Sequence, residues 1–160
     1  MKLRVRALLL ATLIVVLDLL SKAAVLNTIG LAGYVNLPGP IALSPLRNGG
    51  AVLGLFVEQP ELLLLGSLFA VLLLFRLLLS TRRRPMETIA LALLSGGATG
   101  NLIDRATGGG VLDFIDLGTG TLHLPVFNVA DAAISAGVAL LLFLTVTSRP
   151  QPAGRGIEGD

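Results

Sequence analysis

The chain contains no cysteine and only one histidine, His123. The lack of cysteine excludes a disulfide framework, a thiol nucleophile and a thiolate metal site, and one histidine is too few for a histidine-rich metal site. Charged residues are also scarce, at 14% of the 160 residues, whereas 54% are hydrophobic and the mean hydropathy is +0.86. A soluble domain of this length needs more polar surface. The composition therefore predicts a membrane protein.

Four apolar segments are long enough to cross a membrane as helices, because a hydrocarbon core of ~30 Å takes roughly 20 residues. They cover residues 5–26, 62–79, 86–103 and 129–146. The first segment also has the basic start and apolar run of a signal peptide, but Asp18 and Lys22 follow where a small-residue cleavage site is expected. We therefore interpret it as a retained first helix. The sequence predicts an all-α membrane protein with a single membrane-embedded domain over residues 1–148.

Basic residues cluster on one side of the predicted membrane. Nine of the twelve share that side: Lys2, Arg4, Arg6, Arg76, Arg82, Arg83, Arg84, Arg149 and Arg155. Because cytoplasmic segments carry the excess of Lys and Arg, both termini are predicted to be cytoplasmic, with residues 149–160 as a disordered tail. The same rule accounts for the basic run at 82–84, so we expect no nucleic-acid partner. The long connections 27–61 and 104–128 then face the exterior, where loops of that length are usually functional.

Several polar residues near the outer ends of the spans need a physical reason. Asp18 and Lys22 lie four residues apart on one helical face, where they either form a self-satisfied anchor or orient other polar groups around a site. Gly96 and Gly100 predict close packing against a neighbouring helix. Packing does not explain Asn101, because a buried amide must find hydrogen-bond partners.

Asp131 is the residue that the hydropathy pattern explains least. Asn128 suits a cap of the last span, but Asp131 lies within the apolar run, and an ionisable group there is a functional hypothesis by default. Asp113 reaches the same membrane level on the returning outer loop, where the glycines at 108–110 give the chain freedom to bend back. Two facing carboxylates hold one proton near neutral pH, so such a pair can draw a proton from water and protonate a carbonyl oxygen. This is aspartic-protease chemistry, which needs neither a metal nor a cofactor.

Five stretches of the sequence together resemble one protein family. They are DLLSK at 18–22, RNGGAVLGLF at 47–56, GGATGNLIDR at 96–105, GGVLDFID at 109–116 and FNVADAAISAG at 127–137. Each stretch alone is a modest signal, but all five in this order, together with four apolar spans, are highly specific for one family. Over residues 10–140 the chain resembles the lipoprotein signal peptidases (signal peptidase II), which are aspartic proteases of the bacterial inner membrane. One departure is that Val52 and Leu53 replace the Ala-Phe usual in the family.

The resemblance implies a fold, a substrate and roles for particular residues. The implied fold is a four-helix bundle with a small extracytoplasmic β-cradle, which suits the segment 27–61 with its strand-like pieces broken by Pro and Gly. Asp113 and Asp131 would be the catalytic pair. The supporting positions would be Asp18, Lys22, Asn48, Gly50, Asn101, Arg105, Asn128 and Ala130.

The implied partner is a prolipoprotein signal peptide whose cysteine already carries a diacylglyceryl group. The enzyme would cut just before that cysteine, among membrane lipids, near the extracytoplasmic face. Globomycin-type peptides would be expected to inhibit it. The sequence leaves open which of the two aspartates holds the shared proton.

Two other classes of function also use acids near a membrane. A metal-dependent enzyme acting on phosphate head groups would take Asp104, Asp113 and Asp116 as Mg²⁺ ligands, but it leaves Asp131 unexplained. A proton-coupled transporter would place acids near mid-membrane and show an inverted repeat, whereas these acids gather at the outer ends of the spans and no repeat appears. Asp116 is either a partner of the catalytic pair or a solvated loop acid, and we favour the solvated acid.

Overall fold

Four helices and a small sheet make up the part of the chain that the computed structural model describes, residues 2–50, 59–80, 84–119 and 122–147. The helices are α1 (Lys2–Thr28), α2 (Pro60–Leu79), α3 (Pro85–Thr107) and α4 (Val129–Thr147). Each apolar segment of the sequence is therefore helical, with ends displaced by a few residues. α2 and α3 begin at proline, which lacks an amide hydrogen that the first turn leaves unpaired in any case. The predicted tail and the departure at Val52 and Leu53 lie outside the described residues.

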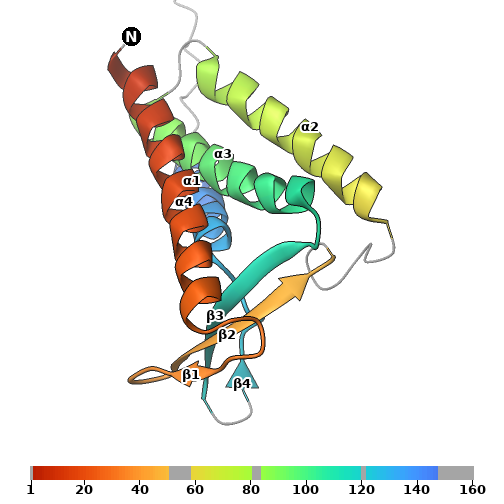
Figure 1. The fold of residues 1–160 in the computed structure, drawn as a ribbon. Helices are drawn as coiled ribbons and strands as arrows, with labels where there is room; N and C mark the ends of the chain where they lie inside the picture. Colours follow the sequence, from red (N-terminus) through yellow and green to blue (C-terminus); the bar gives the residue numbers. More distant parts are fainter. Residues whose placement is uncertain (1, 51–58, 81–83, 120–121, 148–160) are drawn as a thin grey trace, which may run out of the picture.

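α3 is the central helix and contacts the other three (Figure 1). Glycines make these contacts close. A Cβ at Gly96 would lie 2.7 Å from the carbonyl oxygen of Ala11 in α1, and a Cβ at Gly97 would overlap the carbonyl oxygen of Ala130 in α4. Backbones approach this closely only where one side chain is missing, so the predicted packing role of Gly96 is confirmed.

Three of the described helices, α1, α2 and α4, are long and apolar enough to cross a membrane. α2 shows why most clearly, because only Val71 and Leu78 are buried along it while Leu65, Phe69 and Leu72 are exposed. α3 differs because its neighbours bury much of its surface, including Ser95, Gly96, Gly97, Gly100 and Asn101. A helix enclosed by other helices needs fewer apolar side chains than one that faces lipid. The four predicted helices are present, but only three meet the requirements for a span by length and composition.

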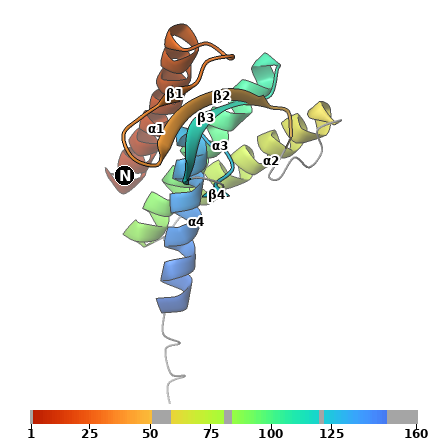
Figure 2. The same ribbon diagram turned by 90° about the horizontal axis from the view of Figure 1, so that it is seen from below.

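A four-stranded antiparallel sheet lies at the end of the bundle away from the N-terminus (Figures 1 and 2). Its strands, in the order β1-β2-β3-β4, are β1 (Val35–Asn36), β2 (Ile41–Asn48), β3 (Val111–Thr119) and β4 (Leu122–His123). The register of β2 and β3 pairs Leu46 with Asp113 and Asn48 with Val111. The expected sheet is therefore present, but it draws two strands from each of the connections 27–61 and 104–128 rather than all of them from the first.

The segment that carries Asp113 is a strand, which corrects the prediction of a flexible loop. Asp113 lies in the nine-residue strand β3 and is only 3% exposed. The first four residues of β3 are all buried, so the strand lacks the alternation of apolar and polar residues that would reveal it in the sequence. Gly110, with φ of 79°, makes the turn from α3 into β3, and a Cβ there would lie 2.5 Å from the carbonyl oxygen of Asn48. The glycines at 108–110 thus build a tight turn against β2.

Candidate active site

Asp113 projects from β3 into an open cavity of about 500 Å³ that is lined by the sheet and by the helices α2, α3 and α4. Its carboxylate accepts two side-chain hydrogen bonds, from Nδ2 of Asn48 at 3.1 Å and from Nδ2 of Asn128 at 2.7 Å. Asn48 is itself held in place, because its Oδ1 accepts the backbone N–H of Gly50 at 3.0 Å. The last residue of β2 therefore orients the acid of the neighbouring strand.

Asp131 lies in the first turn of α4 and lines the same cavity. Its Oδ1 accepts Nδ2 of Asn101 at 2.8 Å, and its Oδ2 accepts the backbone N–H of Asn128 at 3.3 Å. In return, Oδ1 of Asn128 accepts the backbone N–H of Asp131 at 2.8 Å. Such a reciprocal pair is a capping box, so the prediction that Asn128 caps this helix is confirmed. The cap holds the Asp131 carboxylate at the N-terminal end of α4, where it lines the cavity.

Asn128 joins the two acids and is fully buried. Its Nδ2 lies 2.7 Å from Asp113, 3.2 Å from Oδ1 of Asn101 and 3.3 Å from the carbonyl oxygen of Leu112. An amide carries only two hydrogens, so these contacts share them, and the shortest is the one to Asp113. Asn101 in turn bonds both Asn128 and Asp131, which supplies the partners that a buried amide at this position requires. The structure thus brings together both predicted acids and the three predicted asparagines.

Burial raises the pKa of Asp113 from 3.8 to about 6. The hydrogen bonds from Asn48 and Asn128 and the positive charge of Lys22 stabilise the carboxylate and oppose this rise, whereas the negative charge of Asp131 adds to it. A fraction of the molecules therefore still has a protonated Asp113 close to neutral pH. A site with one protonated and one ionised carboxyl group can supply an acid and a base at once.

The remaining wall of the cavity is mostly apolar. Ala70, Ala98 and Ile134 line it from α2, α3 and α4. Arg105 also lines it, near the end of α3, and its guanidinium donates to the carbonyl oxygen of Asn101 at 3.4 Å. Apolar pockets with a few converging polar groups are typical of sites that bind largely apolar ligands.

Asp18 and Lys22 lie behind the cavity rather than in its lining. Nζ of Lys22 lies 2.6 Å from Oδ2 of Asp18 and 2.8 Å from Oδ2 of Asp104, so the pair is not a self-satisfied anchor. Oδ1 of Asp18 accepts the backbone N–H of Ala130 at 2.9 Å, which ties α1 to the first turn of α4. Of the two interpretations of this pair, the structure supports the one in which it orients polar groups. The sequence did not indicate that Asp104 pairs with Lys22. Its position near Asn101 and Arg105, at the end of α3, was the one feature that pointed to it.

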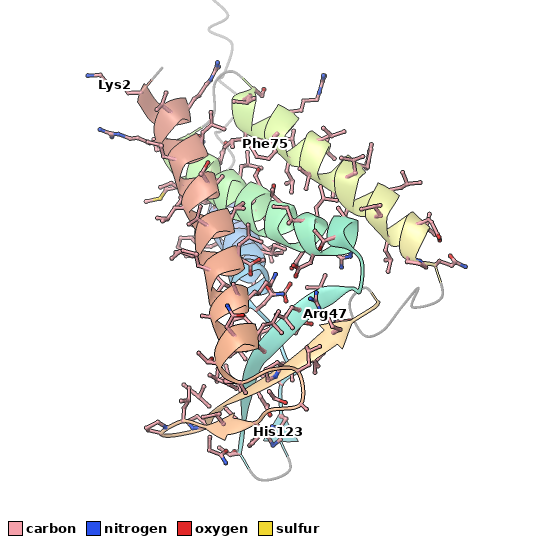
Figure 3. All side chains as sticks on the ribbon, viewed as in Figure 1. Lys2, Arg47, Phe75 and His123 are labelled. Carbon is pink, nitrogen blue, oxygen red and sulfur yellow. The ribbon has the colours of Figure 1, made fainter. Side chains whose placement is uncertain are left out.

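Asp116 lies away from the cavity, on the outer part of the sheet. Its carboxylate is 2.8 Å from Nδ1 of His123, which Figure 3 shows at the far end of the molecule from Lys2. Three positions along a strand place Asp113 and Asp116 on opposite faces. The interpretation of Asp116 as a solvated loop acid is corrected, because the residue is half-buried, on a strand and paired.

The acids that a phosphate-processing metalloenzyme would need are therefore kept apart. Asp104 bonds Lys22, Asp113 faces the cavity and Asp116 bonds His123. Among the described residues, no group of three or more His, Asp or Glu side chains is placed to hold a metal ion.

The family called Signal peptidase (SPase) II has a sequence profile that matches residues 10–147. The chain belongs to the signal peptidase II family. Lipoprotein signal peptidases of Syntrophomonas wolfei and Caulobacter vibrioides are 38% and 40% identical to it, over 135 and 139 residues. These matches cover 84% of this chain and 88% of the first relative, and 83% of this chain and 82% of the second.

A solved structure described as a bacterial membrane enzyme has the same fold. It superposes with a TM-score of 0.79 at 26% identity, over 93% of this chain and 94% of the other. Membership of the signal peptidase II family makes the chain a membrane-bound protease that processes signal peptides.

Proposed function

We propose that this signal peptidase II is an aspartic endopeptidase. It removes the signal peptide from prolipoproteins whose cysteine carries a diacylglyceryl group, and it cuts just before that cysteine. The observation that carries the proposal is the convergence of Asp113 and Asp131 on one cavity, where both acids bond Asn128. The names of the relatives support the substrate class, and the apolar cavity wall supports an occupant with apolar side chains and acyl chains.

The reaction begins with a water molecule held between the two acids. Asp113 carries the proton, because burial favours its neutral form. Asp131 acts as the base. Asp131 takes a proton from the water as its oxygen attacks the carbonyl carbon before the lipidated cysteine. At the same time, Asp113 gives its proton to the carbonyl oxygen. The product of this step is a neutral tetrahedral diol, so no unpaired charge builds up in the buried site.

The second step reverses both proton transfers. Asp131 gives its new proton to the amide nitrogen, the bond between carbon and nitrogen breaks, and one hydroxyl of the diol returns a proton to Asp113. The signal peptide leaves with a carboxyl end and the lipidated cysteine with a free amino group. Both acids are then in their starting states, without any cofactor.

The supporting residues act on these two acids. Asn48 and Asn128 hold Asp113, Asn101 holds Asp131, and Gly50 fixes Asn48. Arg105 contributes a positive charge to the wall that the substrate contacts. Globomycin-type peptides would inhibit by occupying this cavity.

In the bacterial inner membrane, α3 is the fourth span, enclosed by the other three helices. Both termini are cytoplasmic, because the basic residues gather at that end. The sheet, at the end of the bundle away from the N-terminus, then lies near the extracytoplasmic face with the site beneath it.

The decisive experiment is a gel-shift assay with purified enzyme in lipid and diacylglyceryl-modified prolipoprotein. Asp113→Asn and Asp131→Asn should each abolish cleavage, and the double variant should be no worse, because two residues that act as a unit are not additive. Asp116→Asn, on the opposite face of β3, is the matched control and should cleave at the wild-type rate. EDTA should have no effect. Substantial cleavage by either single variant, or recovery of EDTA-treated enzyme on adding a divalent metal, contradicts the mechanism.

A further inference from the structure

The residues directly before the two acids are held in the same way. The backbone N–H of Leu112, before Asp113, donates to Oδ2 of Asp104 at 3.0 Å. The backbone N–H of Ala130, before Asp131, donates to Oδ1 of Asp18 at 2.9 Å. Each acid of the cavity therefore follows a peptide group that a second, buried carboxylate fixes.

Lys22 joins these two outer carboxylates. Its Nζ lies 2.6 Å from Asp18 and 2.8 Å from Asp104. A continuous path of hydrogen bonds thus runs from β3 through α3 and α1 to α4, without passing through the cavity. We call Asp18, Lys22 and Asp104 the buried triad.

The buried triad is well suited to hold β3 and α4 at a fixed distance from each other. Its members are 0%, 4% and 8% exposed in the order Asp18, Lys22 and Asp104, so water does not compete for their bonds. A single lysine between two carboxylates leaves one negative charge, which the two backbone N–H groups offset, and one of these lies at the positive end of α4. Gly100 makes room for the arrangement, because a Cβ there would lie 2.6 Å from Oδ2 of Asp18. Displacing any member leaves a buried charge unpaired, which is costly.

We propose that Asp104 is a positioning residue, and that the buried triad sets the separation of the Asp113 and Asp131 carboxylates through the backbone. The inference rests on the proposed function of the two acids. It adds Asp104 to the supporting positions that the family resemblance implies, and it gives Asp18 and Lys22 a specific task. The triad hydrogen-bonds neither acid directly, so its effect on their positions passes through Leu112 and Ala130, whereas the charge of Lys22 acts on Asp113 through space.

The separation matters because the two acids repel each other when both are ionised. That repulsion falls with distance, so a wider separation brings the two apparent pKa values of the pair closer together. A displacement near 1 Å also misplaces the attacking water, and errors of that size lower rates by about 100-fold. Loss of positioning therefore changes the shape of the pH profile as well as the rate, whereas a loss of folded protein lowers the rate alone.

Two substitutions at one position separate geometry from charge. Asp104→Asn and Asp104→Ala remove the same negative charge, but only Asn leaves an oxygen that can accept the N–H of Leu112. We expect Asp104→Asn to keep most of the wild-type kcat and the wild-type width of the pH profile. We expect Asp104→Ala to lower kcat by about 10- to 100-fold with little change in KM, and to narrow the profile. Asp116→Asn should match the wild type in all three measurements.

Further variants guard against a loss of folding. Asp104→Glu keeps the charge but moves its oxygen by one methylene, so it should also lower kcat and alter the profile. Lys22→Met combined with Asp104→Ala should lose little more than the worse single variant, because both break one path. The folded fraction of each variant is measured by size-exclusion chromatography and thermal unfolding in detergent.

The outcomes distinguish this inference from the proposed function. If Asp113→Asn or Asp131→Asn cleaves prolipoprotein, the proposed function fails and the positioning role fails with it. If those variants are inactive but Asp104→Ala and Asp104→Asn have the same kcat and profile, the positioning role alone is overturned. A lower rate with an unchanged profile, in proportion to the folded fraction, also overturns it. Should Asp104→Ala not fold, a wild-type profile for Asp104→Glu is the overturning result.

Discussion

The side-chain amide of Asn128 lies 2.7 Å from the carboxylate of Asp113, although the two residues belong to different elements of the fold. Asn128 caps α4 and Asp113 is the third residue of β3, so this bond fixes the start of a helix against the beginning of a strand. Because Asn128 also exchanges two hydrogen bonds with Asp131, its position determines how both acids face the cavity.

Asn128→Ala should therefore be the most damaging of the asparagine substitutions. It removes the donor to Asp113 and the cap of α4 together, and loss of such a cap costs about 1 kcal/mol of stability. We expect kcat to fall by about 100-fold or more, as for other losses of active-site geometry. Asn27→Ala, an exposed position near the end of α1, is the control and should keep its activity. Cleavage of prolipoprotein at a similar rate by both variants would contradict the prediction.

Asn48→Ala should move the pH dependence of cleavage upward. In the proposed mechanism Asp113 must keep its proton to act as the acid, so kcat/KM should fall as the pH rises through its pKa of about 6. Asn48 donates to the ionised form, so its removal raises that pKa further and shifts the alkaline fall to higher pH, by about one unit or less. Asp116→Asn should leave the fall where it is. A shift of the alkaline fall toward lower pH for Asn48→Ala would contradict the prediction that Asn48 lowers the pKa of Asp113.

Asp113→Asn should weaken the pH dependence of stability. The folded-state pKa of Asp113 is raised, so the folded protein binds an extra proton between pH 3.8 and about 6 and loses stability as the pH rises through that range. The shift corresponds to at most about 3 kcal/mol above pH 6. Thermal unfolding in detergent should show a fall in Tm from pH 4 to pH 7 for the wild type and a smaller fall for the variant. Equal falls in the two proteins would contradict this.

Gly100→Ala should disrupt both stability and cleavage. The new Cβ would meet Oδ2 of Asp18 at 2.6 Å and force that carboxylate away from Lys22 or from α4. We expect this overpacking to lower the free energy of unfolding by about 1–3 kcal/mol. Gly66→Ala in α2 is the matched control, because nothing lies within 4 Å of its Cβ, and alanine there should stabilise the helix by about 0.5–1 kcal/mol. If both variants have the same Tm and activity, Gly100 has no special role.

Reporter fusions should place both termini in the cytoplasm. Fusions after residue 38 and after residue 119 should report the extracytoplasmic side, because basic residues are concentrated at the other end of the spans. A fusion at residue 83 should report the cytoplasm. A cytoplasmic signal from either of the first two positions would invert the proposed placement of the site.

The helices and Asp131 could be predicted from local features of the sequence, whereas the choice of Asp113 depended on the family motif. Apolar runs gave helical segments within a few residues of the observed ends, since a span requires an uninterrupted apolar stretch. Asn128 was predictable as a cap, because its position before an apolar run is typical of one. Asp131 was identified because an acid within an apolar run is energetically costly to place in a membrane.

The contacts between distant segments could not be predicted in the same way. β3 carries buried residues on both faces, so its sequence lacks a period of two, and the strand was mistaken for a loop. The bond between Lys22 and Asp104 joins two helices, and no periodicity within either helix indicates it. His123 and Asp116 meet because β4 folds back on β3, which depends on a pairing between strands.

The bond between Asp18 and the backbone of Ala130 joins residues 112 positions apart, in the first and last helices. A chain that is still being synthesised has α1 long before it has α4, and before α4 is made it can contain only Asp113 of the proposed catalytic pair. Until the final helix enters the bilayer, Asp113 has no second acid opposite it and Asp18 has no peptide group of α4 to hold. If the proposed mechanism holds, a product that stops before α4 therefore lacks the second acid and should have no proteolytic activity.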